Sequence, residues 1–172
     1  KFLVVLFSLA AVAFAEDARD YFVNWHNGIE NSALRFDLDN GISVHIAYWI
    51  THNYEVFGYS AYNSRVNAYC GYFIDAHDQT VELCNGGYRI MRTPEHLLNR
   101  ISFDYGTGSI SSGIFFNPRS VGAHAVAKYE DYQGHEIFGD YNERSNTFRG
   151  VTFDGRPVVK RNSNGVTLLQ SH

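Results

Sequence analysis

The chain has 172 residues and a formal net charge of -4 at neutral pH, with 19% charged and 16% aromatic residues. A chain with so many aromatic and so few charged side chains can bury a core, which excludes an intrinsically disordered protein. It has no cluster of basic residues, which argues against a nucleic-acid-binding protein and against binding to anionic membrane surfaces.

The first predicted element is a signal peptide at residues 1–15. Lys1 precedes a run of apolar or small residues from Phe2 to Phe14. Ala13 and Ala15 are the small residues that cleavage after position 15 requires. Spanning a bilayer takes about 20 apolar residues, so this run is too short for a membrane anchor. The sequence therefore predicts a secreted, extracellular protein with no membrane span.

Short segments of strand type follow along the rest of the chain. They are rich in Val, Ile, Tyr, Phe and Thr and are separated by turns such as Asn85-Gly86-Gly87 and Asp154-Gly155. Strands are expected at residues 33–38, 42–50, 54–60, 69–75, 80–84, 88–92, 100–105, 111–116, 123–129, 135–140, 148–153 and 157–161. A helical turn is expected at residues 94–98, with Thr93 as its N-cap. Many short strands at this spacing predict an all-β sandwich or barrel.

The chain has two cysteines, Cys70 and Cys84. In a secreted protein an even pair most simply forms one disulfide. The spacing suits neighbouring strands joined by a hairpin, and closing a loop of this length stabilises a fold by about 3 kcal/mol. Two free thiols or a metal-binding pair are the alternatives, and an oxidising compartment disfavours both.

A weak internal repeat is visible at an offset of 81 residues. Glu55-Val56-Phe57-Gly58 begins seven residues after Tyr48, and Glu136-Ile137-Phe138-Gly139 begins seven residues after Tyr129. Two further pairs fall on the same offset, Gly41 with Gly122 and Ser64 with Ser145. Duplicated β units would explain the recurrence. Coincidence in a chain rich in Tyr, Phe and Gly would explain it equally.

The stretch from Ala125 to Gly134, AVAKYEDYQG, resembles the opening of a βγ-crystallin motif. In that family an apolar strand ends in Tyr-Glu-Asp, and an aromatic residue, one further residue and a glycine fold the hairpin back over the strand. The resemblance implies a positive φ at Gly134 and aromatic packing of Tyr129 and Tyr132 across the folded hairpin. Residues 148–159 resemble the closing strand pair of the same motif.

A fainter unit precedes this one. Asp78, Leu83, Gly86 and Tyr88 keep the family's spacing, although Asp78 stands where glycine is usual. The resemblance covers about residues 69–161 and implies an all-β, Greek-key β-sandwich with at most one or two helical turns. Residues 69–172 are then expected to form a βγ-crystallin-like domain. Residues 16–68 are expected to form an N-terminal β segment, packed on that domain or duplicated from it.

The resemblance also implies calcium as a ligand. Two segments resemble the family's calcium motif, Asp39-Asn40-Gly41-Ile42-Ser43 and Asn99-Arg100-Ile101-Ser102, with departures at Val44, Leu98 and Phe103. Calcium prefers oxygen ligands held on tight turns. The candidate metal ligands are Asp39, Asn40, Ser43, Asn99 and Ser102. The alternative is that Asp and Asn stand there as good turn formers.

No constellation in the sequence predicts catalysis. The eight histidines lack the paired spacing of a zinc enzyme, and the Gly-X-Ser-X-Gly elbow of a serine hydrolase is missing. We therefore expect a non-enzymatic βγ-crystallin-like protein, structural or related to innate immunity, with an extracellular protein or glycan as partner. A lectin-like carbohydrate- or surface-binding module and a secreted protease inhibitor are the alternatives. Candidate sugar-binding aromatics are Trp25, Trp49, Tyr54, Tyr59, Tyr62, Tyr69 and Tyr72, unless they form the core.

Overall fold

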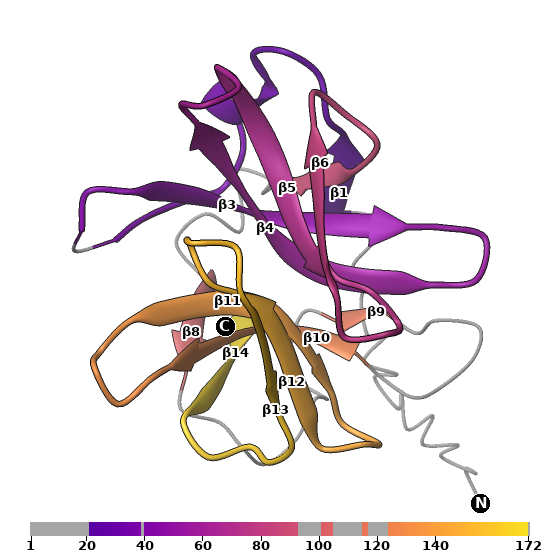
Figure 1. Ribbon diagram of the computed structural model, residues 1–172, viewed down its shortest axis with the longest axis vertical. Coiled ribbons are helices and arrows are strands. Elements are labelled where there is room, and N and C mark those ends of the chain that lie inside the picture. The colour runs from indigo at the N-terminus through magenta and orange to yellow at the C-terminus, as the bar shows by residue number, and fades with distance from the viewer. Residues whose placement is uncertain (1–20, 39, 93–100, 105–114, 117–123, 172) are drawn as a thin grey trace, which may run out of the picture.

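The computed structural model describes residues 21–38, 40–92, 101–104, 115–116 and 124–171. These residues form two antiparallel sheets that pack against each other (Figure 1), together with one short 3-10 helix, η2 (Ile29–Asn31). The predicted all-β sandwich is therefore confirmed. The expected signal peptide at residues 1–15 and the expected helical turn at residues 94–98 lie outside the described residues.

Each sheet has seven strands. The first contains β1 (Phe22–Asn24), β2 (Arg35–Asp37), β3 (Ser43–Ile50), β4 (Glu55–Asn63), β5 (Ala68–Ile74), β6 (Thr80–Cys84) and β7 (Arg89–Met91). The second contains β8 (Ile101–Asp104), β9 (Phe115–Phe116), β10 (His124–Glu130), β11 (Glu136–Asn142), β12 (Thr147–Val151), β13 (Pro157–Lys160) and β14 (Val166–Ser171). No helix in the described part of the chain is long and apolar enough to cross a membrane.

The two sheets have the same topology. The first has the order β1-β7-β3-β4-β5-β6, with β2 also paired to β3. The second has the order β8-β14-β10-β11-β12-β13, with β9 also paired to β10. Adding seven to every strand number converts one sheet into the other. The fold is therefore a duplicated seven-strand unit, and the units change between residues 92 and 101. The division expected after residue 68 falls instead within β5.

The Greek-key order is not confirmed. In a Greek key, three consecutive strands are followed by a fourth that returns beside the first. Here four consecutive strands pair in sequence, and the fifth, β7 or β14, returns beside the first. The fourth strand of each series, β6 or β13, stays at the sheet edge.

The 81-residue offset relates equivalent positions in β4 of the first unit and β11 of the second. Gly58 and Gly139 are both fourth in their strands, β4 and β11. A Cβ atom would lie 2.1 Å from the Tyr72 carbonyl oxygen at Gly58, and 2.0 Å from the Arg149 carbonyl oxygen at Gly139. Glycine therefore permits the same close approach of the neighbouring strand in both units.

The hairpin tips are equivalent at an offset of 79 instead. The Tyr62 hydroxyl donates to the Asn67 side chain in one tip, as the Tyr141 hydroxyl does to Asn146 in the other. Both asparagines have positive φ, 53° at Asn67 and 49° at Asn146. The offset changes because β4 has nine residues and β11 has seven.

The main hydrophobic core lies between the sheets. Phe57 of β4 and Phe138 of β11 are each 1% exposed and belong to the same buried cluster, to which both units contribute. Each sheet also has a smaller apolar cluster of its own, one around Phe73 and one around Phe148. Burying a side chain of this size contributes about 2–3 kcal/mol.

The predicted disulfide is confirmed. Cys70 and Cys84 are directly opposite on β5 and β6, and their sulfur atoms are bonded at 2.03 Å. The bond therefore ties an edge strand of the first sheet to its neighbour.

Candidate functional site

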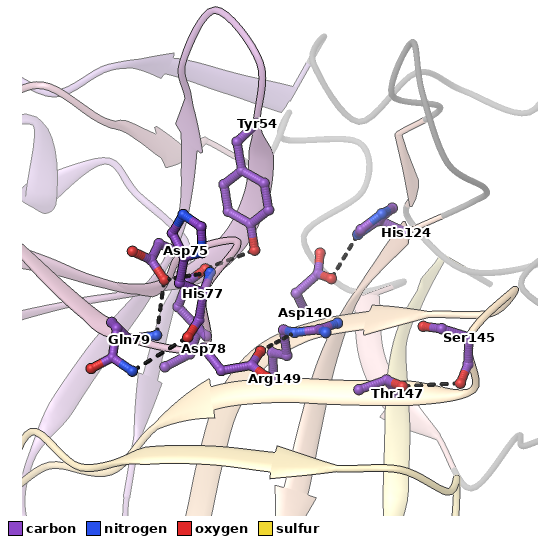
Figure 2. Close-up of polar contacts among 11 residues, drawn as sticks. Tyr54, Asp75, His77, Asp78, Gln79, His124, Asp140, Ser145, Thr147 and Arg149 are labelled. Atoms are coloured by element: carbon purple, nitrogen blue, oxygen red, sulfur yellow. Dashed lines mark hydrogen bonds and ion pairs between the residues drawn. The ribbon is translucent and has the colours of Figure 1, made fainter.

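One flank of the interface between the sheets is lined by polar side chains (Figure 2). From the second sheet, β10, β11 and β12 contribute His124, Asp140 and Arg149. From the first, the turn between β5 and β6 contributes Asp75 and Asp78. In Figure 2 His124 points toward Asp140, and Arg149 toward Asp78 across the interface.

Asp140 joins the sheets from a buried position. Its side chain is 1% exposed, and one oxygen lies 2.6 Å from Nδ1 of His124. The other oxygen accepts the backbone N–H of Phe57 in the first sheet, at 3.4 Å. A buried carboxylate is costly without such partners, so these contacts are what permit it here.

The His124 ring is held from both sides. Its Nε2 lies 2.8 Å from the Asn142 side-chain nitrogen. The Asn142 side-chain oxygen in turn accepts the N–H of Ser145 at 2.9 Å, which fixes the amide orientation. Burial, the largest single influence, lowers the pKa of His124, but the charge and hydrogen bond of Asp140 outweigh it and the net shift is upward. This arrangement orients the ring toward Asp140 and Asn142.

The Asp75–Gln79 turn forms the first-sheet side of this flank. The Asp75 carboxylate accepts the N–H groups of His77 at 2.8 Å and Gln79 at 2.9 Å. Asp78 has a φ of 59°, and its carboxylate accepts from Nε of Arg149 at 2.8 Å. Tyr54 donates to the carbonyl oxygen of Ile74, and burial raises the pKa of its hydroxyl.

A second flank of the interface is aromatic. Tyr59 stacks on Tyr72 with ring centroids 5.0 Å apart, and Phe153 packs edge-on against Tyr59 at 5.2 Å. The Tyr59 hydroxyl donates to the carbonyl oxygen of Thr152 at 3.1 Å. This flank therefore holds the β12–β13 turn of the second sheet against the first sheet.

A groove of about 680 Å³ opens beside Phe153. Its walls come from three turns: the one between β2 and β3, the one between β10 and β11, and the one between β12 and β13. Tyr132 projects from the second of these and is 93% exposed. The volume lies within the usual range of small-molecule sites, about 300–1,000 Å³.

The charges that line the groove are paired within the protein. Asp131 accepts the N–H groups of Gln133 and His135 and lies 3.1 Å from the His135 ring, and the His135 N–H is the main cause of its lowered pKa. Asp154 accepts from the Thr152 hydroxyl, the main cause of its own lowered pKa, and lies 2.7 Å from Arg156. The groove thus offers hydrogen-bonding groups, and its carboxylates already have partners within the protein.

The predicted metal ligands do not share one region in the described structure. Asn40 lines the groove, but its side-chain oxygen accepts the N–H of Ile42 at 3.0 Å. The Ser43 hydroxyl donates to Asp37 at 2.6 Å. Ser102 lies in β8 of the other sheet, and Asp39 and Asn99 lie outside the described residues. Calcium binding stays a prediction.

Most of the aromatics proposed to bind sugar are part of the packing. Trp25, Trp49 and Tyr54 pack on the smaller cluster of the first sheet, Tyr59 is buried, and Tyr72 packs on the main core. Tyr62 is 52% exposed at a hairpin tip, where it packs edge-on against Tyr69.

Tyr132, the most exposed aromatic among the residues that the structure describes, was not among those candidates. The resemblance to βγ-crystallins implied that it packs across its hairpin, and its exposure shows that this was wrong. Its place in the Asp131–His135 turn is the signal that could have found it, because a hairpin turn directs side chains toward solvent.

Comparison with known proteins supports the fold alone. No family model and no curated protein sequence matches the chain. Among solved structures, the nematode sperm cell motility protein MFP2B is similar, with a TM-score of 0.65 and 12% sequence identity. The match covers 88% of this chain and 46% of MFP2B, so this chain spans about half of that protein's length.

Proposed function

We propose that this chain is a secreted, non-enzymatic binding protein whose groove holds carbohydrate. The disulfide-linked β-sandwich supports an extracellular protein. The observation that carries the proposal is Tyr132, an almost fully exposed ring at the rim of a groove lined by both apolar and polar side chains. A flat aromatic face packs on the C–H groups of a sugar ring, and neighbouring polar groups can bond its hydroxyls.

The charge arrangement favours a neutral sugar. Asp131 is paired with His135, Asp154 with Arg156, and Glu136 with Lys128. A sulfated or uronic-acid chain would have to disturb these pairs or approach the carboxylates that line the groove, which costs affinity. Binding of neutral glycans on a foreign surface is the defence-related role that the proposal implies.

A glycan array that includes neutral, sulfated and uronic-acid chains tests the proposal. We expect neutral glycans to bind, and Tyr132→Ala to weaken the best of them about tenfold or more, equivalent to 1.4 kcal/mol or more. Tyr62→Ala is the matched control, because Tyr62 is also exposed but lies on the other sheet, away from the groove. Absence of glycan binding, or an equal loss in both variants, would contradict the proposal.

A further inference from the structure

We propose that His124, Asp140 and Asn142 form a pH-dependent latch between the two sheets, which holds more tightly in acid than in alkaline solution. The latch lies on the polar flank of the interface and does not line the groove. It therefore stands apart from the proposed carbohydrate binding, and either proposal can fail without the other.

Asp140 is the part of the latch that spans the interface. Its carboxylate contacts the first sheet through the N–H of Phe57 and its own sheet through His124. At 1% exposure it has almost no water to stabilise its charge, so the state of the histidine decides how well that charge is compensated. A protonated His124 gives Asp140 a counter-charge at 2.6 Å, and a neutral one gives it only a hydrogen bond.

The neighbouring elements carry two further charges that act on the ring. Arg149 on β12 opposes protonation of His124, and Glu55 on β4 favours it. Together with the dominant burial effect and the opposing effect of Asp140, they leave the pKa of His124 raised in the folded chain. The unfolded chain has the ordinary histidine value of about 6.5.

The sign of the stability effect follows from this direction. A folded-state pKa above the unfolded value means that folding takes up a proton between the two values. The contribution of His124 to the free energy of unfolding is therefore fully present below about pH 6.5. It is lost as the pH rises through the pKa of His124 in the folded chain. The buried His45 acts in the opposite direction, because burial lowers its pKa, so only a comparison of variants isolates the latch.

Asn142 couples the proton to the hairpin tip. In the observed geometry the neutral ring accepts from the amide nitrogen of Asn142, whose oxygen is held by the N–H of Ser145. A protonated ring has an N–H at that position, so the amide must rotate to present its oxygen. That rotation withdraws the acceptor from Ser145, and the Ser145 N–H then reports the state of the latch.

The test compares the unfolding midpoint in urea of the full chain, from pH 5.5 to 8.5, for wild type and His124→Gln. We expect the folding equilibrium constant of wild type to fall relative to that of the variant as the pH rises across this range. The control is His135→Gln, which removes an exposed histidine that also pairs with an aspartate. The latch would be overturned if wild type and His124→Gln had the same pH profile of stability. It would also be overturned if His135→Gln changed that profile as much as His124→Gln does.

A second measurement needs no variant. Nuclear magnetic resonance of the folded wild-type chain follows the His124 ring and the Ser145 N–H during a pH titration. We expect His124 to titrate above the ordinary histidine value and the Ser145 N–H signal to move with the same midpoint. A His124 titration below that value, or a Ser145 N–H signal that ignores it, would overturn the proposal even if His124→Gln does not fold.

Discussion

The two flanks of the inter-sheet interface occupy equivalent positions in the duplicated fold and differ in chemistry. Tyr59 follows Gly58 and lies opposite Tyr72, just as Asp140 follows Gly139 and lies opposite Arg149. On each flank this pair contacts a hairpin turn of the other sheet, through Tyr59 on one side and Arg149 on the other.

This difference shows that the backbone arrangement does not depend on one kind of contact. The glycine and the shared core set how closely the strands approach, and either an aromatic or a charged pair completes the interface. The aromatic flank borders the groove, whereas the polar flank contains charged groups that titrate and whose interactions depend on salt. The two units therefore share one architecture, but one flank of their interface is aromatic and the other is polar.

The largest expected effect tests whether the two units fold as one. Phe57→Ala and Phe138→Ala should each lower the free energy of unfolding by about 3–5 kcal/mol, because each leaves a cavity in the shared core. Urea denaturation followed by fluorescence and circular dichroism should give a single transition in both variants. Val66→Ala, at an exposed position, serves as the control. Two separated transitions would show that the sheets unfold independently.

A disulfide joins Cys70 and Cys84 in the first unit, and these are the two cysteines of the chain. Replacing both by alanine should lower the free energy of unfolding by about 3 kcal/mol, because the unfolded chain regains the freedom of the closed loop. Hydrogen exchange should show the loss of protection first in β5 and β6. A protection loss that starts in β12 and β13 would contradict this assignment, and peptide mapping without reduction checks the bond itself.

The framework could be predicted from the sequence where β-branched and aromatic residues cluster between turn residues, as in residues 42–50 and 69–75. β14 was missed because it lies between β10 and β8 and buries Val166, Leu168 and Leu169 on both of its faces. Such a strand shows no alternation of apolar and polar residues. The short β1 was missed because three residues give too little pattern without their partner strand.

The duplication and the groove were harder to predict for another reason. The repeat offset is 81 residues at Gly58 and Gly139 but 79 at the hairpin tips, so no single period spans the unit. Some equivalent inner positions keep the same residue, such as Phe57 and Phe138, but others differ, such as Tyr59 and Asp140. The groove joins the turn at Asn40 to the distant turns at Asp131 and Asp154, and local patterns say nothing about such contacts.

A smaller effect compares the cross-interface contacts of the two flanks. The contact between Arg149 and Asp78 is partly exposed, so we expect a coupling of about 0.5–1 kcal/mol in a double-mutant cycle with Arg149→Met and Asp78→Asn. Asparagine is chosen because it tolerates the positive φ of Asp78. The coupling should weaken in 1 M salt.

On the aromatic flank, Tyr59→Phe removes the hydrogen bond to Thr152. We expect a loss of about 1 kcal/mol that does not change with salt. Equal salt dependence of Tyr59→Phe and the charged cycle would show that the flanks do not differ as described.

The smallest expected effect concerns calcium at the turn between β2 and β3, where the side-chain oxygens of Asn40 and Ser43 already have partners. The Asn40 oxygen accepts from Ile42, the Ser43 hydroxyl donates to Asp37, and Asp37 also pairs with Arg35. A calcium ion would have to displace these contacts, so we expect millimolar calcium to raise the melting temperature by less than about 2 °C relative to chelator. Magnesium at the same concentration controls for ionic strength. If calcium alone raised the melting temperature by several degrees, and Asn40→Ala removed that rise, the turn would be a calcium site. Because this turn also lines the groove beside Phe153, binding in the groove would then depend on calcium.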